Sequence, residues 1–85
     1  MPNYPVAIEP GDETTAYGVV VPDLPGCFSA GESIEEALEK TKEVIAGHLV
    51  LLCKDGQRPP APSSAEVYAD RPEFEGFIWA VVSVG

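Results

Sequence analysis

The fold is decided by residues 17–37, Tyr-Gly-Val-Val-Val-Pro-Asp-Leu-Pro-Gly-Cys-Phe-Ser-Ala-Gly-Glu-Ser-Ile-Glu-Glu-Ala. Residues 17–21 alternate with a period of two and are rich in valine, a pattern that predicts a strand. The next six residues, Pro22-Asp23-Leu24-Pro25-Gly26-Cys27, contain two prolines without an N–H group and a glycine that permits a positive φ. We therefore expect a rigid bend at residues 22–27 and a short strand over residues 28–30.

A long amphipathic helix follows. Ser33 and Glu36 have the spacing of a capping box, in which a hydroxyl and a carboxylate accept hydrogen bonds from free N–H groups at the start of a helix. The helical pattern begins at about Ile34 and continues to about Asp55, and Gly56 stands where a left-handed residue commonly ends a helix. One largely apolar sector is expected to cover a sheet. Its members are Ile34, Leu38, Thr41, Ile45, Leu49 and Leu52.

The opposite side of this helix is acidic. Glu32, Glu36, Glu39 and Glu43 recur at intervals of four, three and four residues. Such a stripe is commonly only the hydrated side of a helix. Because Glu32 and Glu36 follow the bend closely, we expect them to contribute with residues 22–27 to a partner-binding surface.

The last turns of the helix are apolar nearly all round, from Ala46 to Cys53. Val50 occupies the angular position of the acidic stripe, and Gly47 would permit close approach of another chain. A segment that is apolar on every side is usually covered from more than one direction. We therefore expect this end of the helix, with Val50 and Leu51, to contact another subunit or a partner.

The flanking segments complete a small sheet. Residues 4–8 alternate as a first strand, and residues 9–13 form a turn into the second strand. Residues 57–64 contain three prolines and predict a stiff extended connector, after which residues 66–68 form a brief extended segment or a helical turn. Residues 77–84 are apolar on both faces, which predicts a buried strand that is central or covered on each side.

Together these elements predict one α+β domain spanning residues 1–85. We expect a three-stranded antiparallel meander, one long helix on one face, and a last strand parallel to the first, in the spatial order 3-2-1-4. One helix covers only one of two sheet faces, so Phe77 and Trp79 are expected at a bare face that drives assembly into a homodimer or homotetramer. A chain of 85 residues also has only a marginal core of its own.

Residues 17–37 resemble the N-terminal domain of HicB-family antitoxins. Residues 54–63, Lys-Asp-Gly-Gln-Arg-Pro-Pro-Ala-Pro-Ser, are similar to the loop that follows the helix in that family, and the likeness covers nearly the whole chain. The resemblance implies a truncated ribonuclease-H-like fold. It also implies a protein partner, the HicA toxin, a ribonuclease whose surface and catalytic histidine HicB-type domains block.

Family members commonly carry a C-terminal ribbon-helix-helix or helix-turn-helix module that binds operator DNA. The 85 residues contain no such module and no cluster of Lys and Arg to bind phosphates. We therefore expect no direct contact with nucleic acid.

A surface with a net charge of −9 repels phosphate backbones and favours a basic partner, although acidity can also serve solubility alone. No basic segment precedes an apolar run, and no apolar run reaches the ~20 residues of a membrane span, so we expect a cytoplasmic protein without membrane contact. Cys27 and Cys53 are interpreted as small hydrophobic residues in a reducing compartment, and a disulfide between them stays open.

The sequence offers little for catalysis. Residues 4–8 and 77–84 contain no Asp or Glu, whereas a ribonuclease-H nuclease needs carboxylates on its central strands to hold metal ions. His48 is the single histidine and is interpreted as structural. We therefore expect no catalytic residue, no metal and no cofactor, and classify the protein as a non-enzyme.

Three functional hypotheses remain in competition. The first is an antitoxin that binds a basic toxin through the bend, where Asp23 is either a partner contact, a local turn former, or both. The second is an orphan HicB-like oligomeric domain with another partner or a regulatory role. The third is an enzyme or small-ligand binder that uses a cleft beside His48 and Asp23.

Overall fold

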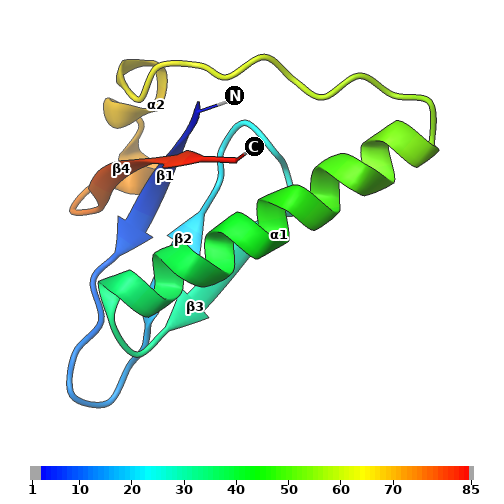
Figure 1. Cartoon of the computed structure of the whole chain (residues 1–85). Helices are drawn as coiled ribbons and strands as arrows, with labels where there is room; N and C mark the ends of the chain where they lie inside the picture. The colour runs from blue at the N-terminus through cyan, green and yellow to red at the C-terminus, as the bar shows by residue number, and fades with distance from the viewer. Residues whose placement is uncertain (1–2, 85) are drawn as a thin grey trace.

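The chain forms a four-stranded antiparallel sheet with one long helix across one face (Figure 1). The computed structural model describes residues 3–84. Its elements are β1 (Asn3–Glu9), β2 (Tyr17–Val20), β3 (Phe28–Gly31), α1 (Ile34–Lys54), the single-turn α2 (Glu66–Ala69), the 3-10 helix η1 (Pro72–Phe74) and β4 (Ile78–Ser83). The strand order β3-β2-β1-β4 and the α+β class are confirmed, and the predicted strands and long helix begin and end within one residue of the observed ones.

The predicted direction of the last strand is wrong. β4 runs antiparallel to β1, with Ser83 opposite Asn3 and Ile78 opposite Ile8. The prediction treated α1 as the whole crossover between the strands. In Figure 1, α1 returns the chain past the end of the sheet at which β1 begins, and residues 55–77 then carry it back to the other end before β4 starts. This second traverse reverses β4.

β1 is the central strand and is buried on both faces. Val6 faces α1, and Ala7 faces the other side of the sheet; neither side chain is accessible to solvent. Each large aliphatic side chain buried in this way contributes about 1.5 to 3 kcal/mol of gross driving force. The helix-facing core also contains Tyr4, Ile8, Val19, Val21, Leu24, Cys27, Ala37, Ile45, Val82 and Val84.

The ends of α1 follow the predicted signals. Ser33 Oγ accepts a hydrogen bond from the N–H of Glu36 at 3.1 Å, and Glu36 Oε1 accepts one from the N–H of Glu32 at 3.2 Å. The capping box is therefore present, with Glu32 rather than Ser33 as the donor to the carboxylate. At the other end Gly56 has a φ of +74°, the left-handed conformation that glycine adopts without strain.

α1 approaches β3 closely through small and hydroxyl side chains. A Cβ atom on Gly31 would lie 2.5 Å from the backbone nitrogen of Ala37, so only glycine fits there. The buried Thr41 hydroxyl donates to the Ala37 carbonyl at 2.7 Å and lies 2.6 Å from Ser29 Oγ. A polar group inside the core is thus satisfied, and it ties the helix to the strand.

β4 has exposed side chains on both of its faces, so the expectation that it is covered on each side is wrong. Its helix-facing Ile78 is 46% exposed, and Val81 on the opposite face is 64% exposed. Trp79 does not lie on a bare face either, because Tyr68 of α2 stacks on it at 6.3 Å and Phe74 of η1 meets it edge-on at 5.3 Å. The connector between α1 and β4, residues 55–77, therefore covers part of the sheet face that lies opposite α1.

Candidate partner-binding surfaces

The bend at residues 22–27 is closed by its own backbone. The N–H of Val21 donates to the Cys27 carbonyl at 3.1 Å, and the N–H of Cys27 donates to the Leu24 carbonyl at 2.9 Å. Gly26 supplies the expected positive φ of +83°. Leu24 and Cys27 are buried in the core, and Pro25 and Gly26 are the exposed residues of the bend.

Asp23 holds the connector to the bend. Its side chain is 8% exposed, and its two oxygens accept hydrogen bonds from the N–H of Ser63 at 2.7 Å and the hydroxyl of Tyr68 at 2.5 Å. These donors lie 40 and 45 positions farther along the chain, so the carboxylate is used over a long range and not to close its own turn. Desolvation alone would raise the pKa of Asp23, but the hydrogen bonds from Ser63 and Tyr68 outweigh it and lower that pKa.

Tyr68 is the residue that sequence reasoning missed. Its ring stacks on Trp79, the guanidinium carbon of Arg71 lies 4.9 Å from its ring centroid, and its hydroxyl binds Asp23. The hydrogen bond to the Asp23 carboxylate is the main cause of the raised pKa of Tyr68. The only signal in the sequence was an aromatic residue in a polar segment, and that pattern names no partner.

The exposed part of the predicted partner-binding set lies at the two ends of β3. Pro25 and Gly26 precede this strand, and Glu32 and Glu36 follow it. Phe28 of β3 is 68% exposed and lies between them in the chain. Glu36 pairs with Lys40 at 3.3 Å, and the N–H of Glu32 together with Lys40 lowers the pKa of the Glu36 carboxyl. Both glutamates are exposed.

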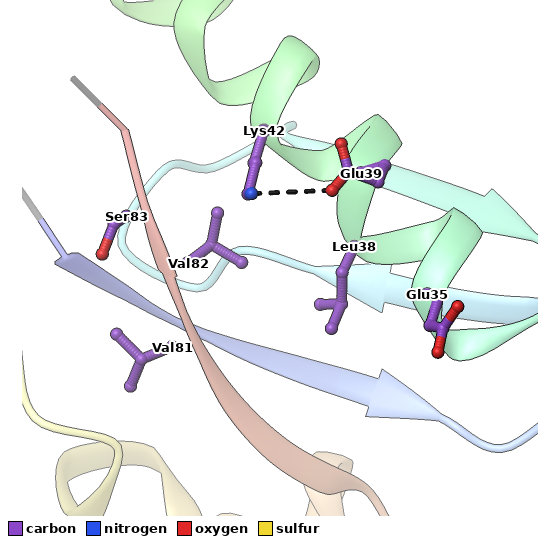
Figure 2. A pocket seen from close by; sticks show the side chains of 7 residues that line it. All are labelled: Glu35, Leu38, Glu39, Lys42, Val81, Val82 and Ser83. Carbon is purple, nitrogen blue, oxygen red and sulfur yellow. Dashed lines mark ion pairs between the residues drawn. The ribbon is translucent and has the colours of Figure 1, made fainter.

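A groove runs between α1 and β4 on the helix side of the sheet (Figure 2). Its volume is about 540 Å³. Leu38 and Val82 point toward each other across it, whereas Val81 points away toward the opposite face. Glu35, Glu39 and Lys42 of α1 and Ser83 of β4 complete the lining, and the Lys42 ammonium pairs with the Glu39 carboxylate at 3.6 Å.

The C-terminal turns of α1 extend past the sheet, as Figure 1 shows. Val50 is 54% exposed and Leu51 is 61% exposed. Phe77, the other residue predicted at an oligomer interface, is half-buried against Phe74 at a centroid distance of 5.8 Å. The four residues predicted to mediate assembly therefore fall into two separate places, the end of α1 and the start of β4.

The described residues form no cluster of side chains typical of a metal site. Across residues 3–84 no three side chains of His, Cys, Asp or Glu converge in a way that could hold a metal ion. His48 is half-buried on α1, and the Asp23 carboxylate is bonded to Ser63 and Tyr68. Cys27 is buried and Cys53 is exposed, and both are free thiols, so the disulfide left open by the sequence is not formed.

Within residues 3–84, no helix has both the length and the apolar composition to cross a membrane.

The family model for the HicB-like antitoxins of bacterial toxin-antitoxin systems matches residues 4–85. The chain belongs to this family. An uncharacterised 14.9 kDa protein of Haemophilus phage HP1, from the rep-hol intergenic region, is 41% identical over 81 residues, which are 95% of this chain and 59% of the phage protein.

Solved antitoxins have the same fold as this HicB-like chain. The antitoxin HicB of Burkholderia pseudomallei matches with a TM-score of 0.88 and 40% identity over 99% of this chain and 64% of that one. A chain of the HicA3 and HicB3 toxin-antitoxin complex matches with a TM-score of 0.79 and 27% identity over 98% of both chains. The chain therefore spans about three fifths of the phage relative and just under two thirds of the Burkholderia antitoxin.

Proposed function

We propose that this chain is the antitoxin of a type II toxin-antitoxin pair and that it neutralises a small, basic, mRNA-cleaving toxin of the HicA type by direct contact. The observation that carries the proposal is the match to a chain of the HicA3 and HicB3 complex, which extends over 98% of both chains. The proposal treats the chain as a binding protein without catalytic activity. Since the toxin's target is mRNA, the proposal assigns the pair to the cytoplasm.

Charge supports a basic partner. The chain carries 14 acidic residues against five basic ones. Two of those five, Lys40 and Lys42, are paired with glutamates of α1. A toxin that binds RNA presents positive charge, so the two surfaces attract each other at long range.

We assign the toxin contact to the side of the molecule that carries β3. The exposed Pro25 and Gly26 of the bend contact the toxin directly. Asp23, Leu24 and Cys27 are buried beneath them and fix the shape of the bend. Pro22 is half-buried at the start of the bend. Glu32 and Glu36 supply negative charge at the other end of β3, and a partner that covers this strand would contact both groups.

The test is inhibition of RNA cleavage by the small basic protein encoded beside this chain. We expect an equimolar amount of the chain to stop cleavage and the affinity to fall about tenfold or more as salt is raised from low to high concentration. A salt-independent affinity would remove the charge argument. Incubation of the chain alone with RNA and Mg²⁺ is the control, and turnover there would overturn the non-enzyme assignment.

An orphan HicB-like domain with a different protein partner remains the second candidate. The observation that favours it is the apolar end of α1, where Val50 is 54% exposed and Leu51 is 61% exposed, a surface suited to a protein partner other than a basic toxin. Failure of the neighbouring protein to co-purify with this chain, together with unaltered RNA cleavage, would favour the orphan role.

A further inference from the structure

The sheet face opposite α1 is covered on one half only. On the half formed by β1 and β4, Tyr68 of the connector stacks on Trp79, and Ala7 is inaccessible to solvent. On the half formed by β2 and β3, Val20 is 38% exposed and Phe28 is 68% exposed. We call this second part of the face the open half. It adjoins the bend, because β2 leads into the bend and β3 leaves it.

Phe28 and Val20 form an apolar pair on the open half. The register places them directly opposite each other across β3 and β2, so their side chains are neighbours. Ala30, two residues after Phe28, is exposed on the same face. Among residues 3–84, no other large hydrophobic residue has an exposed fraction as high as that of Phe28. An exposed aromatic ring in an apolar patch is typical of a side chain that anchors a protein interface.

Gly18 leaves an open space beside this pair. The register aligns Glu9, Gly18 and Ala30 in one row across β1, β2 and β3. Apart from its neighbours in the chain, a Cβ atom on Gly18 would meet only the Cβ of Glu9, at 3.9 Å. The space over Gly18 therefore lies between a side chain that ends in a carboxylate and a methyl group. It suits a lysine or arginine, whose stem is apolar and whose end is charged.

The charge around the open half has one sign. All five Lys and Arg residues of the chain lie at position 40 or later, so β1, β2, β3 and the loops between them carry acids and no base. Four exposed acids lie near the Gly18 end of these strands, Glu9, Asp12, Glu13 and Glu32. A second copy of this chain or an anionic lipid surface would be repelled, whereas a basic protein would be attracted.

We infer that the open half is the surface on which the toxin is anchored. An apolar side chain of the toxin packs on Phe28 and Val20, and a lysine or arginine of the toxin lies over Gly18 with its charge against Glu9. This inference rests on the proposed function and adds to the bend a set of contacts that determine affinity and specificity. Phe28 supplies affinity, and Glu9 with Gly18 selects a basic residue at one position of the partner.

The first test compares two truncations of exposed apolar side chains. Phe28→Ala removes the proposed anchor, and Leu51→Ala removes a side chain that is 61% exposed at the C-terminal end of α1. Calorimetric titration with the small basic protein encoded beside this chain should give a Kd raised about 30-fold or more for Phe28→Ala and less than about threefold for Leu51→Ala. An unchanged Kd for Phe28→Ala, or a larger loss for Leu51→Ala, would overturn the inference and leave the proposed function standing.

The second test fills the space over Gly18. Gly18→Val should fold, because valine favours a strand and the added Cβ meets no backbone atom. We expect a native far-UV circular dichroism spectrum, an unchanged or higher thermal midpoint, and a Kd for the same basic protein raised about tenfold or more. Wild-type affinity in this variant would overturn the assignment of a basic side chain to the space.

Glu9→Gln tests the same contact without filling the space. The amide keeps the shape of the side chain and removes its charge, so we expect a Kd raised about threefold to tenfold and a weaker dependence of Kd on salt. A salt dependence equal to that of the wild type would show that Glu9 does not face a basic residue, and would overturn that part of the inference.

The last experiment needs no toxin. Its probe is a synthetic helical peptide with a stripe of leucines flanked by arginines, and the control peptide has glutamate in place of arginine. In two-dimensional amide NMR, the arginine peptide should shift the resonances of Val20, Phe28 and Ala30, and the glutamate peptide should not. Equal shifts with both peptides, shifts confined to the end of α1, or no shift would overturn the inference. Shifts on the open half, combined with no binding of the neighbouring protein, would overturn the proposed function and assign the open half to another basic protein.

Discussion

The two faces of the sheet are covered in different ways. One lies under α1, whose 21 residues repeat an apolar sector along their length. The other is covered in part by the irregular connector, which is fixed by a few specific contacts between Asp23, Ser63, Tyr68 and Trp79. Val81 and Phe28 stay exposed on this second face.

This difference predicts two kinds of stability. Under α1 the contribution is spread over many apolar contacts, so the helix and the strands should unfold together. On the opposite face, a small number of polar contacts holds residues 55–77, a segment that has little hydrophobic core of its own. The connector is also held from the helix-facing core, where the Tyr4 hydroxyl donates to the Pro60 carbonyl at 2.9 Å. Losing the polar contacts should release the connector locally while the sheet and helix persist.

The largest effect is expected for Ile45→Ala. Ile45 is inaccessible at the centre of α1, and its truncation leaves a cavity between helix and sheet that costs about 3 to 4 kcal/mol of the free energy of unfolding. Chemical denaturation followed by circular dichroism measures this loss. Val50→Ala on the exposed end of α1 is the matched control and should change stability by less than about 0.5 kcal/mol. Similar losses in the two variants would contradict the assignment of the core.

An intermediate effect is expected for Asp23→Asn. The amide keeps the shape of the side chain but loses the charge that strengthens the bonds from Ser63 and Tyr68, at a cost of about 2 kcal/mol. Trp79 is the only tryptophan, so release of Tyr68 from its ring should red-shift the fluorescence before the far-UV signal changes. Tyr68→Phe should give a similar shift, and the two losses should not add.

The stability difference between the wild type and Asp23→Asn should depend on pH. Hydrogen bonds hold the pKa of Asp23 below that of the unfolded chain, which is about 3.9. The contribution of the carboxylate is therefore complete above about pH 4 and is lost as the pH falls through the folded pKa. The stability difference between wild type and Asp23→Asn should shrink over that range. A difference that stays constant from neutral pH to about pH 2 would show that the charge of Asp23 is not what holds the connector.

The smallest effect is expected for Ser33→Ala. The hydroxyl caps α1 by accepting from the N–H of Glu36, and its loss should cost about 1 kcal/mol. The thermal midpoint measures the change, and Ser33→Asp should restore it because aspartate is an equally good cap. A loss as large as that of Ile45→Ala would mean that α1 depends on its first turn more than on its contact with the sheet.

Much of the helix side could be predicted from the sequence. Alternation over residues 17–21, the capping pair Ser33 and Glu36, and Gly56 after the last turn are local signals, and each describes the backbone within a few residues of itself. They were sufficient for the element boundaries and the strand order. The end of α1 was singled out because its residues are apolar on nearly every side; Val50 and Leu51 are exposed there, and their contact with another subunit or a partner stays a prediction.

The connector side could not be predicted in the same way. The partners of Asp23 lie 40 and 45 residues away, and nothing near them in the chain marks them as donors. The direction of β4 failed for the same reason, because residues 55–77 show no periodicity that would reveal a second traverse of the molecule.

The sequence by itself determined the class of fold, the bounds of its elements, the acidic charge and the family, because these depend on composition and on patterns within short windows. Only the tertiary structure decided that β4 runs antiparallel to β1, that Asp23 binds the connector and that Trp79 lies under Tyr68. These features depend on how a long irregular segment returns across the sheet. That path is set by contacts between distant residues, which no short window contains.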